Sequence, residues 1–197
     1  MNYGNDGSLI GGKTYFGSQE SFLLIDELGR IGYGGNNGKW ETQSIGATQL
    51  FIPTASLATK VSSGPASLVI LEDTGDNEVY ANFILPENYK EGTDVVVGFS
   101  IGQTTNVAVG NYMIRAGWQI TNPDVISANA SQTITIPTAL DRVGLLQTEY
   151  LSHVPSVNVE ANGHLSVAIR RDVTTYNDTY LEPVHLYGVF IKYQTYY

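Results

Sequence analysis

Three carboxylates lie close together in one short polar segment, DTGDNE, at residues 73–78. Asp73, Asp76 and Glu78 are separated there by Thr, Gly and Asn, and oxygen-rich loops of this kind can hold calcium, which takes roughly 6–8 oxygen ligands. Their spacing does not match an EF-hand loop, and Asp, Gly and Asn are also the residues that a tight turn between strands selects. We therefore favour a solvated turn over a calcium site, and we expect no cofactor.

Tyrosine is the most informative enrichment, with thirteen residues that concentrate toward the C-terminal end. The segment YNDTY places Tyr176, Asn177, Asp178 and Tyr180 in one polar loop. Aromatic rings stack on sugar rings, and polar side chains beside them bond sugar hydroxyls, so this loop is the candidate glycan contact. The alternative, which we favour, is that the tyrosines fill interfaces between subunits, where tyrosine is enriched.

Patterns that would indicate catalysis are weak in this chain. The three histidines, His153, His164 and His185, do not have the spacing of a metal-binding pair. No G-x-S-x-G turn and no phosphate-binding loop occurs in the sequence. Carboxylates are available in the second half of the chain, but no spacing pairs two of them across a cleft for glycoside hydrolysis. We interpret the chain as a non-enzymatic protein.

Composition excludes several classes of function. The 197 residues contain 19 acidic and 10 basic side chains, which gives a formal net charge of −9. Nucleic-acid binding needs clustered Lys and Arg, so we expect no nucleic-acid partner. The chain has no cysteine, which excludes disulfides and thiolate chemistry. No apolar run approaches the roughly 20 residues that span a membrane as a helix.

The segment from Val79 to Ile101 predicts two strands joined by a polar turn. Hydrophobic residues alternate along the chain on both sides of Pro86, which has no N–H to give to a sheet. We expect this segment to be the central hairpin of a β-sandwich. The core residues expected from alternation here and further along the chain are Phe83, Leu85, Val97, Phe99, Ile114, Trp118, Val167 and Ile169.

Short alternating runs bounded by Gly, Pro and Asn recur to the C-terminus, whereas helical periodicity is almost absent. We therefore predict an all-β chain in which residues 46–197 form a jelly-roll-like antiparallel β-sandwich. Residues 1–45 differ, because glycines interrupt short apolar pairs there. We interpret them as a Gly-rich N-terminal arm, shaft or attachment segment, with a pair of edge hairpins on the main domain as the equally weighted alternative.

The last predicted strand, residues 184–193, is apolar on both faces. A strand with one face in water carries polar residues on that face, so both faces should be covered. Leu186 and Phe190 are expected to point into the sandwich. An uncovered apolar patch is rare on monomers, and a closed ring of identical subunits would cover it, so we expect a homotrimer. The residues of this expected oligomer interface are Tyr187, Val189, Ile191 and Tyr193.

Several segments resemble virion structural proteins of bacteriophages and related viruses. The run FILPENYKEGT at residues 83–93, followed by an alternating strand, resembles a Pro-led turn motif in those proteins. The segments FIPTAS (51–56) and LYGVFIKY (186–193) and the strand that contains Trp118 fit the same layout. Tyr89 stands where the motif would have Trp. The resemblance covers about residues 50–193, and no functional residue carries over from it.

This resemblance implies a non-enzymatic β-sandwich domain of a tail fibre, a head fibre or a capsid decoration, a class that is often trimeric. The expected protein is therefore a virion structural component, a capsid decoration or a fibre or spike part. It would assemble in the host cytoplasm, be exposed on the particle surface, and contact other virion proteins through its arm. The alternative function is a carbohydrate- or receptor-binding fibre head that contacts a host surface glycan.

Overall fold

The computed structural model describes residues 8–10, 13–17, 22–25, 31–34, 38–63, 66–103, 110–122, 126–137 and 147–196. Its regular structure consists of β-strands and the short 3-10 helices η1 (Ala47–Gln49) and η3 (Ser156–Asn158). The all-β prediction is confirmed. Within the ranges given, the structure contains no helix that is long and apolar enough to cross a membrane.

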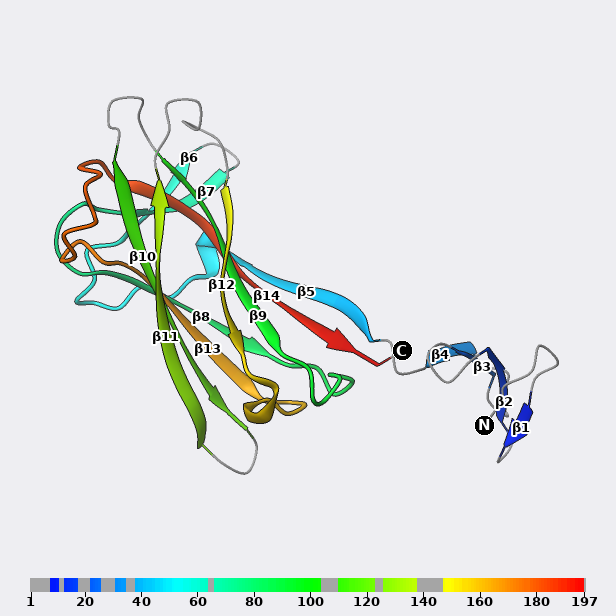
Figure 1. Cartoon of the computed structure of the whole chain (residues 1–197). Helices are drawn as coiled ribbons and strands as arrows, with labels where there is room; N and C mark the ends of the chain where they lie inside the picture. Colours follow the sequence, from blue (N-terminus) through cyan, green and yellow to red (C-terminus); the bar gives the residue numbers. More distant parts are fainter. Residues whose placement is uncertain are drawn as a thin grey trace.

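The main body is a sandwich of two antiparallel sheets (Figure 1). The first sheet has the strand order β11-β10-β13-β8. The second has the order β12-β9-β14-β7-β6, and β5 also pairs with β14. The strands of the first sheet are β8 (Asn77–Ile84), β10 (Asn111–Thr121), β11 (Ile126–Pro137) and β13 (His164–Arg171). Those of the second are β5 (Lys39–Gly46), β6 (Thr59–Ser63), β7 (Ala66–Leu71), β9 (Val95–Gln103), β12 (Gln147–Val154) and β14 (Val184–Thr195). The β-sandwich prediction is therefore confirmed.

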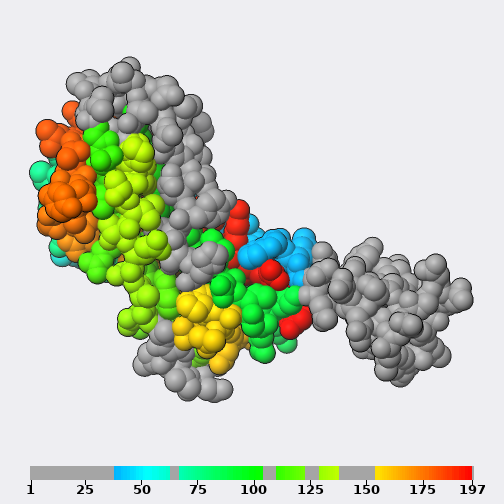
Figure 2. Space-filling view, in the orientation of Figure 1, coloured from blue at the N-terminus to red at the C-terminus, as the bar shows by residue number. Residues whose placement is uncertain are grey.

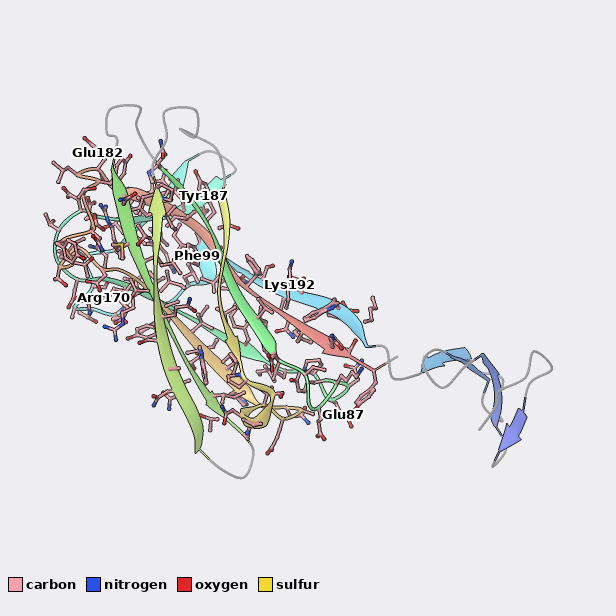
Figure 3. All side chains as sticks on the ribbon, viewed as in Figure 1. Glu87, Phe99, Arg170, Glu182, Tyr187 and Lys192 are labelled. Atoms are coloured by element: carbon pink, nitrogen blue, oxygen red, sulfur yellow. The ribbon has the colours of Figure 1, made fainter. Side chains whose placement is uncertain are left out.

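The core lies between the sheets and follows from the alternation of the strands. On β8, for example, every second residue from Asn77 to Phe83 is buried, whereas the residues between them face outward. All eight predicted core residues are buried, and the most exposed of them, Trp118, has only 7% of its surface accessible. Figure 3 shows Phe99 between the sheets, with Arg170 and Lys192 on opposite outer sides.

The predicted central hairpin is wrong, although its two strands exist. β8 pairs with β13, while β9 pairs with β12 and β14 in the other sheet. Residues 85–94 therefore cross from one sheet to the other, and Leu85 and Tyr89 of this crossing are buried in the core. Alternation shows which side of a strand is apolar but not which strand lies beside it, so both arrangements place the same side chains inside.

The N-terminal strands form a third, smaller antiparallel sheet of their own, with the order β1-β2-β3-β4. The predicted arm, residues 1–45, extends too far toward the C-terminus, because β5 starts at Lys39 and pairs with β14 along Gly188–Thr195. Residues 39–45 therefore belong to the sandwich. The arm's attachment role stays a prediction. The strands of the small sheet are β1 (Ser8–Ile10), β2 (Lys13–Gly17), β3 (Phe22–Ile25) and β4 (Ile31–Gly34).

The predicted oligomer interface on the last strand is wrong for three of its four residues. The register of β14 against β9 shifts between Leu186 and Gly188, and an extra residue of this kind inverts the alternation that follows. Val189, Ile191 and Tyr193 consequently face the core of the same chain, where each is at most 5% exposed. Tyr187 is half-buried. The homotrimer itself stays a prediction.

Phe99 gives a direct test of the sandwich core. Phe99→Ala should lower the free energy of unfolding by about 3–5 kcal/mol, because it removes a fully buried ring and leaves a cavity. The matched control is Phe51→Ala, since Phe51 is 63% exposed and its loss should change stability by only about 0.5 kcal/mol. Urea unfolding followed by fluorescence measures both. Equal effects of the two variants would contradict the fold.

Candidate functional site

A hollow of about 450 Å³ lies on the outer face of the first sheet of the sandwich, β11-β10-β13-β8, which is called the four-stranded sheet below. Residues of all four strands line it, from Tyr80 on β8 to Ser131 on β11. Figure 2 shows β11, the yellow-green segment, exposed along this side of the molecule. The hollow is therefore a feature of the sheet surface itself, positioned by strands on a rigid scaffold.

The register of the strands explains why the sheet is hollowed there. Tyr80, Ala168, Gly117 and Ser131 are direct neighbours across β8, β13, β10 and β11. The two central positions carry the smallest side chains of the row, so the sheet surface lies lower in the middle than at Tyr80. A Cβ added at Gly117 would meet its nearest atoms at 3.6–4.0 Å, which is ordinary contact. The floor of the hollow is therefore open above the backbone.

Polar side chains form the next row of the same face. Asn82, Ser166, Gln119 and Asn129 are neighbours across the four strands. The Ser166 hydroxyl donates to Asn82 Oδ1 at 2.7 Å. Gln119 and Asn129 are exposed, and their amides have no hydrogen-bond partner among the described residues. This row offers amide donors and acceptors to a ligand in the hollow.

The aromatic ring of Tyr80 lines the hollow at β8, and the ring of Phe51 lies beside it. Phe51 joins the edge of β8 through a pair of backbone hydrogen bonds with Tyr80, at 2.8 and 2.9 Å. Their ring centroids are 6.3 Å apart, and the Phe51 ring is 63% exposed. The Tyr80 hydroxyl donates to Glu78 Oε2 at 2.7 Å, and this bond, burial and the Glu78 charge raise the pKa of Tyr80. Tyr80 is thus a neutral ring held in a fixed position.

A charged row lies on the other side of the small central residues. Glu78, Arg170, Arg115 and Thr133 are neighbours across the strands. A second hollow of about 210 Å³ lies among these side chains and shares Gly117, Ser131 and Ala168 with the first. The two hollows therefore form one groove, defined here as the face groove, with a polar part and a charged part.

The predicted glycan loop does not assemble a site. Tyr176 is 90% exposed and Asn177 is also exposed. The Asp178 side chain, in contrast, is only 4% exposed and accepts two hydrogen bonds from Arg171, at 2.9 and 3.1 Å. Tyr180 is fully buried, with its ring 5.9 Å from the Arg171 guanidinium carbon. The prediction is therefore wrong for Asp178 and Tyr180, because these side chains hold the loop to the core.

Two of the three carboxylates considered for calcium, Asp76 and Glu78, are engaged by protein groups. Asp76 Oδ1 lies 2.6 Å from Arg170 Nη2, and Glu78 accepts the Tyr80 hydroxyl. The buried Asn77 side chain closes the turn by bonding the backbone of Glu72. Among the described residues, no three His, Cys, Asp or Glu side chains lie close enough together to hold a metal ion. The segment forms the turn that precedes β8.

No local pattern in the sequence indicated the face groove. Its residues are scattered over residues 78–170, and nothing in their local spacing connects them. The one available signal was a row of small and polar residues at outward positions, such as Gly117 opposite the buried Trp118 on β10. Locating the groove needed the register between four strands, which no single segment encodes.

Comparisons with known proteins place the chain in no family: no family model and no curated protein matches it. The solved structures that match include two at 12% identity. One, TmCBM61 in complex with beta-1,4-galactotriose, has a TM-score of 0.39 over 82% of this chain and 94% of that one. The other belongs to the carbohydrate-binding modules of the β-sandwich superfamily, with a TM-score of 0.35 over 90% and 72%. At these scores neither likeness carries an argument about what this chain binds.

The two kinds of residue in the YNDTY loop should differ sharply in their effect on stability. Asp178→Ala should lower the free energy of unfolding by about 3–5 kcal/mol, because it leaves the buried Arg171 charge without its carboxylate. Tyr176→Ala is the control in the same loop and should change stability by about 0.5 kcal/mol or less. Thermal and urea unfolding measure both. A near-neutral Asp178→Ala would show that the loop is not anchored in this way.

Proposed function

We propose that this protein binds carbohydrate in the face groove. The observation that carries the proposal is the row of four neighbours in which Gly117 and Ala168 form a floor between an aromatic edge and polar side chains. A volume of about 450 Å³ falls in the range of small-molecule sites, roughly 300–1,000 Å³. The groove is open to solvent along the sheet, as a segment of a glycan chain requires.

The chemistry of the lining matches that of a sugar. A pyranose ring has apolar C–H faces that pack on aromatic rings, and Tyr80 supplies such a ring at one edge, with Phe51 beside it. Its hydroxyls both donate and accept hydrogen bonds. The exposed amides of Gln119 and Asn129 supply both functions in the neighbouring row. An aromatic edge beside amides on a rigid sheet can thus hold a sugar ring in one orientation.

The groove favours binding over cleavage. Glycoside hydrolysis ordinarily uses two carboxyl groups that face each other across the bond. Among the described lining residues of the two hollows, Glu78 is the single carboxylate, and its oxygen already accepts the Tyr80 hydroxyl. We infer a non-catalytic role for the groove.

The viral interpretation stays a prediction from the resemblance of residues 50–193. This holds for the virion location, the capsid or fibre role, the homotrimer and attachment through the arm. A glycan-binding groove fits the receptor-binding fibre head that was the alternative function. The proposal moves the glycan contact from the YNDTY loop to the outer face of the four-stranded sheet.

Filling the floor of the groove tests the proposal. Gly117→Val should keep the fold, because the new Cβ meets only ordinary contacts and valine suits a strand. It should reduce glycan affinity by about tenfold or more, since the branched side chain occupies the ligand space. A glycan array identifies ligands of the unmodified protein, and calorimetric titration then compares the variants.

Tyr176→Ala is the matched control for this experiment, because it removes an exposed ring from the loop that was the candidate glycan contact in the sequence. Its glycan affinity should equal that of the unmodified protein. An unaffected Gly117→Val variant, or loss of binding in Tyr176→Ala, would place the site elsewhere. An array with no ligand at all would refute carbohydrate binding.

A further inference from the structure

We propose that the glycan bound in the face groove carries a carboxylate, as a uronic acid does, and that Arg115 is the residue that selects it. This inference rests on the proposed carbohydrate function and adds the class of sugar. It is drawn from the charged part of the groove, where a hollow of about 210 Å³ lies against Arg115, Arg170 and Glu78.

The charges along this row do not balance at Arg115. Arg170 and Arg115 lie directly opposite each other on β13 and β10, and like charges in that position repel. Arg170 has two acidic neighbours, since it pairs with Asp76 at 2.6 Å and lies opposite Glu78. The other neighbour of Arg115 is the uncharged Thr133. Within the described part of the chain, no carboxylate pairs with Arg115, so an anion in the hollow would complete the row.

Arg115 is held at the side of the groove. Its Nη2 donates to Ser131 Oγ at 3.1 Å, and Ser131 lines both hollows. This bond uses one of the five donors of the guanidinium and leaves the others for a ligand. Because Ser131 lies opposite Gly117 on β11, the Arg115 side chain extends toward the row of small residues at the centre of the groove.

A second arginine, Arg170, lines the same hollow. Arg170 Nε is buried and, among the described residues, has no hydrogen-bond acceptor. A buried polar group without a partner is costly, and such groups in native structures are commonly satisfied by a bound ion, water or ligand. The hollow presents the remaining donors of Arg115 next to the positive charge of Arg170, whose Nη2 pairs with Asp76 in the turn before β8.

These donors suit a carboxylate better than a hydroxyl. A guanidinium is planar and presents parallel N–H groups that match the two oxygens of a carboxylate, and such charge-assisted pairs are shorter and stronger than bonds to neutral oxygens. A uronic acid places this group directly on a pyranose ring. One sugar can then contact the aromatic and amide side chains while its carboxylate, or that of the next sugar, reaches Arg115.

The overall charge of the protein opposes this preference without removing it. A net charge of −9 repels an acidic glycan at long range. At physiological salt the screening length is about 8 Å, so most of that repulsion is screened, whereas a pair in direct contact is screened much less. The binding comparison should therefore be made at physiological ionic strength.

The test compares uronic-acid oligosaccharides with the same oligosaccharides after reduction of their carboxyl groups to alcohols. The unmodified protein should bind the acidic form about tenfold or more tightly, in line with a charge-assisted hydrogen bond. Arg115→Gln should remove this difference and keep the weaker binding of the reduced form. Arg115→Lys, which retains the charge but loses the planar fork, should keep only part of the preference.

Lys192→Gln is the matched control. It removes one positive charge, as Arg115→Gln does, but from the other sheet, on the far side of the sandwich (Figure 3). Its preference for acidic sugars should equal that of the unmodified protein. Thermal unfolding of each variant confirms that the fold is kept.

The outcomes separate the two proposals. Equal binding of the acidic and reduced sugars, or an Arg115→Gln variant that keeps the preference, would overturn the assignment to Arg115 and leave carbohydrate binding in place. Failure of every oligosaccharide to bind, including the neutral members of a broad array, would overturn carbohydrate binding and this inference together.

Discussion

The ion pair and hydrogen bonds of the buried Arg171 side chain are the interactions that join the two sheets at one end of the sandwich. This side chain is fully buried and forms a two-pronged ion pair with Asp178 in the loop that leads to β14. The same guanidinium donates to backbone oxygens of Leu71, Tyr180 and Glu182. One residue at the end of β13 thereby connects the first sheet, β7 of the second sheet and the loop between them. A buried charge with this many partners is costly to leave unpaired, which fixes the loop against the core.

The face groove lies on the side of β13 opposite to the buried Arg171 side chain. Because Arg171 points inward, alternation places Arg170, Ala168 and Ser166 on the outer face of β13. Arg171 also lies opposite Asn77, whose buried amide closes the turn before β8. Two buried polar side chains thus lie opposite each other at one end of the β8–β13 pairing, in the register that brings Glu78 and Tyr80 beside Arg170 and Ala168.

The sequence predicted the fold class and the core well, because alternation is a local property that each strand carries in full. It failed where neighbours matter. Alternation before and after Pro86 could not show that the two strands belong to different sheets. The inverted faces of β14 depend on one extra residue near Tyr187, which no local pattern reveals. The groove escaped detection because Gly117 and Ala168 gain meaning only from their register, whereas Asp178 attracted a functional interpretation that its burial contradicts.

The central claim is that the outer face of the four-stranded sheet is a carbohydrate site. Amide NMR shifts during titration with a glycan ligand test it most directly, since they locate the contact without any substitution. We predict that the largest changes fall on the segments that meet at the groove, residues 78–82, 115–119, 129–133 and 166–170. Changes confined to residues 172–183, or to the outer face of the sheet that contains β14, would contradict the account.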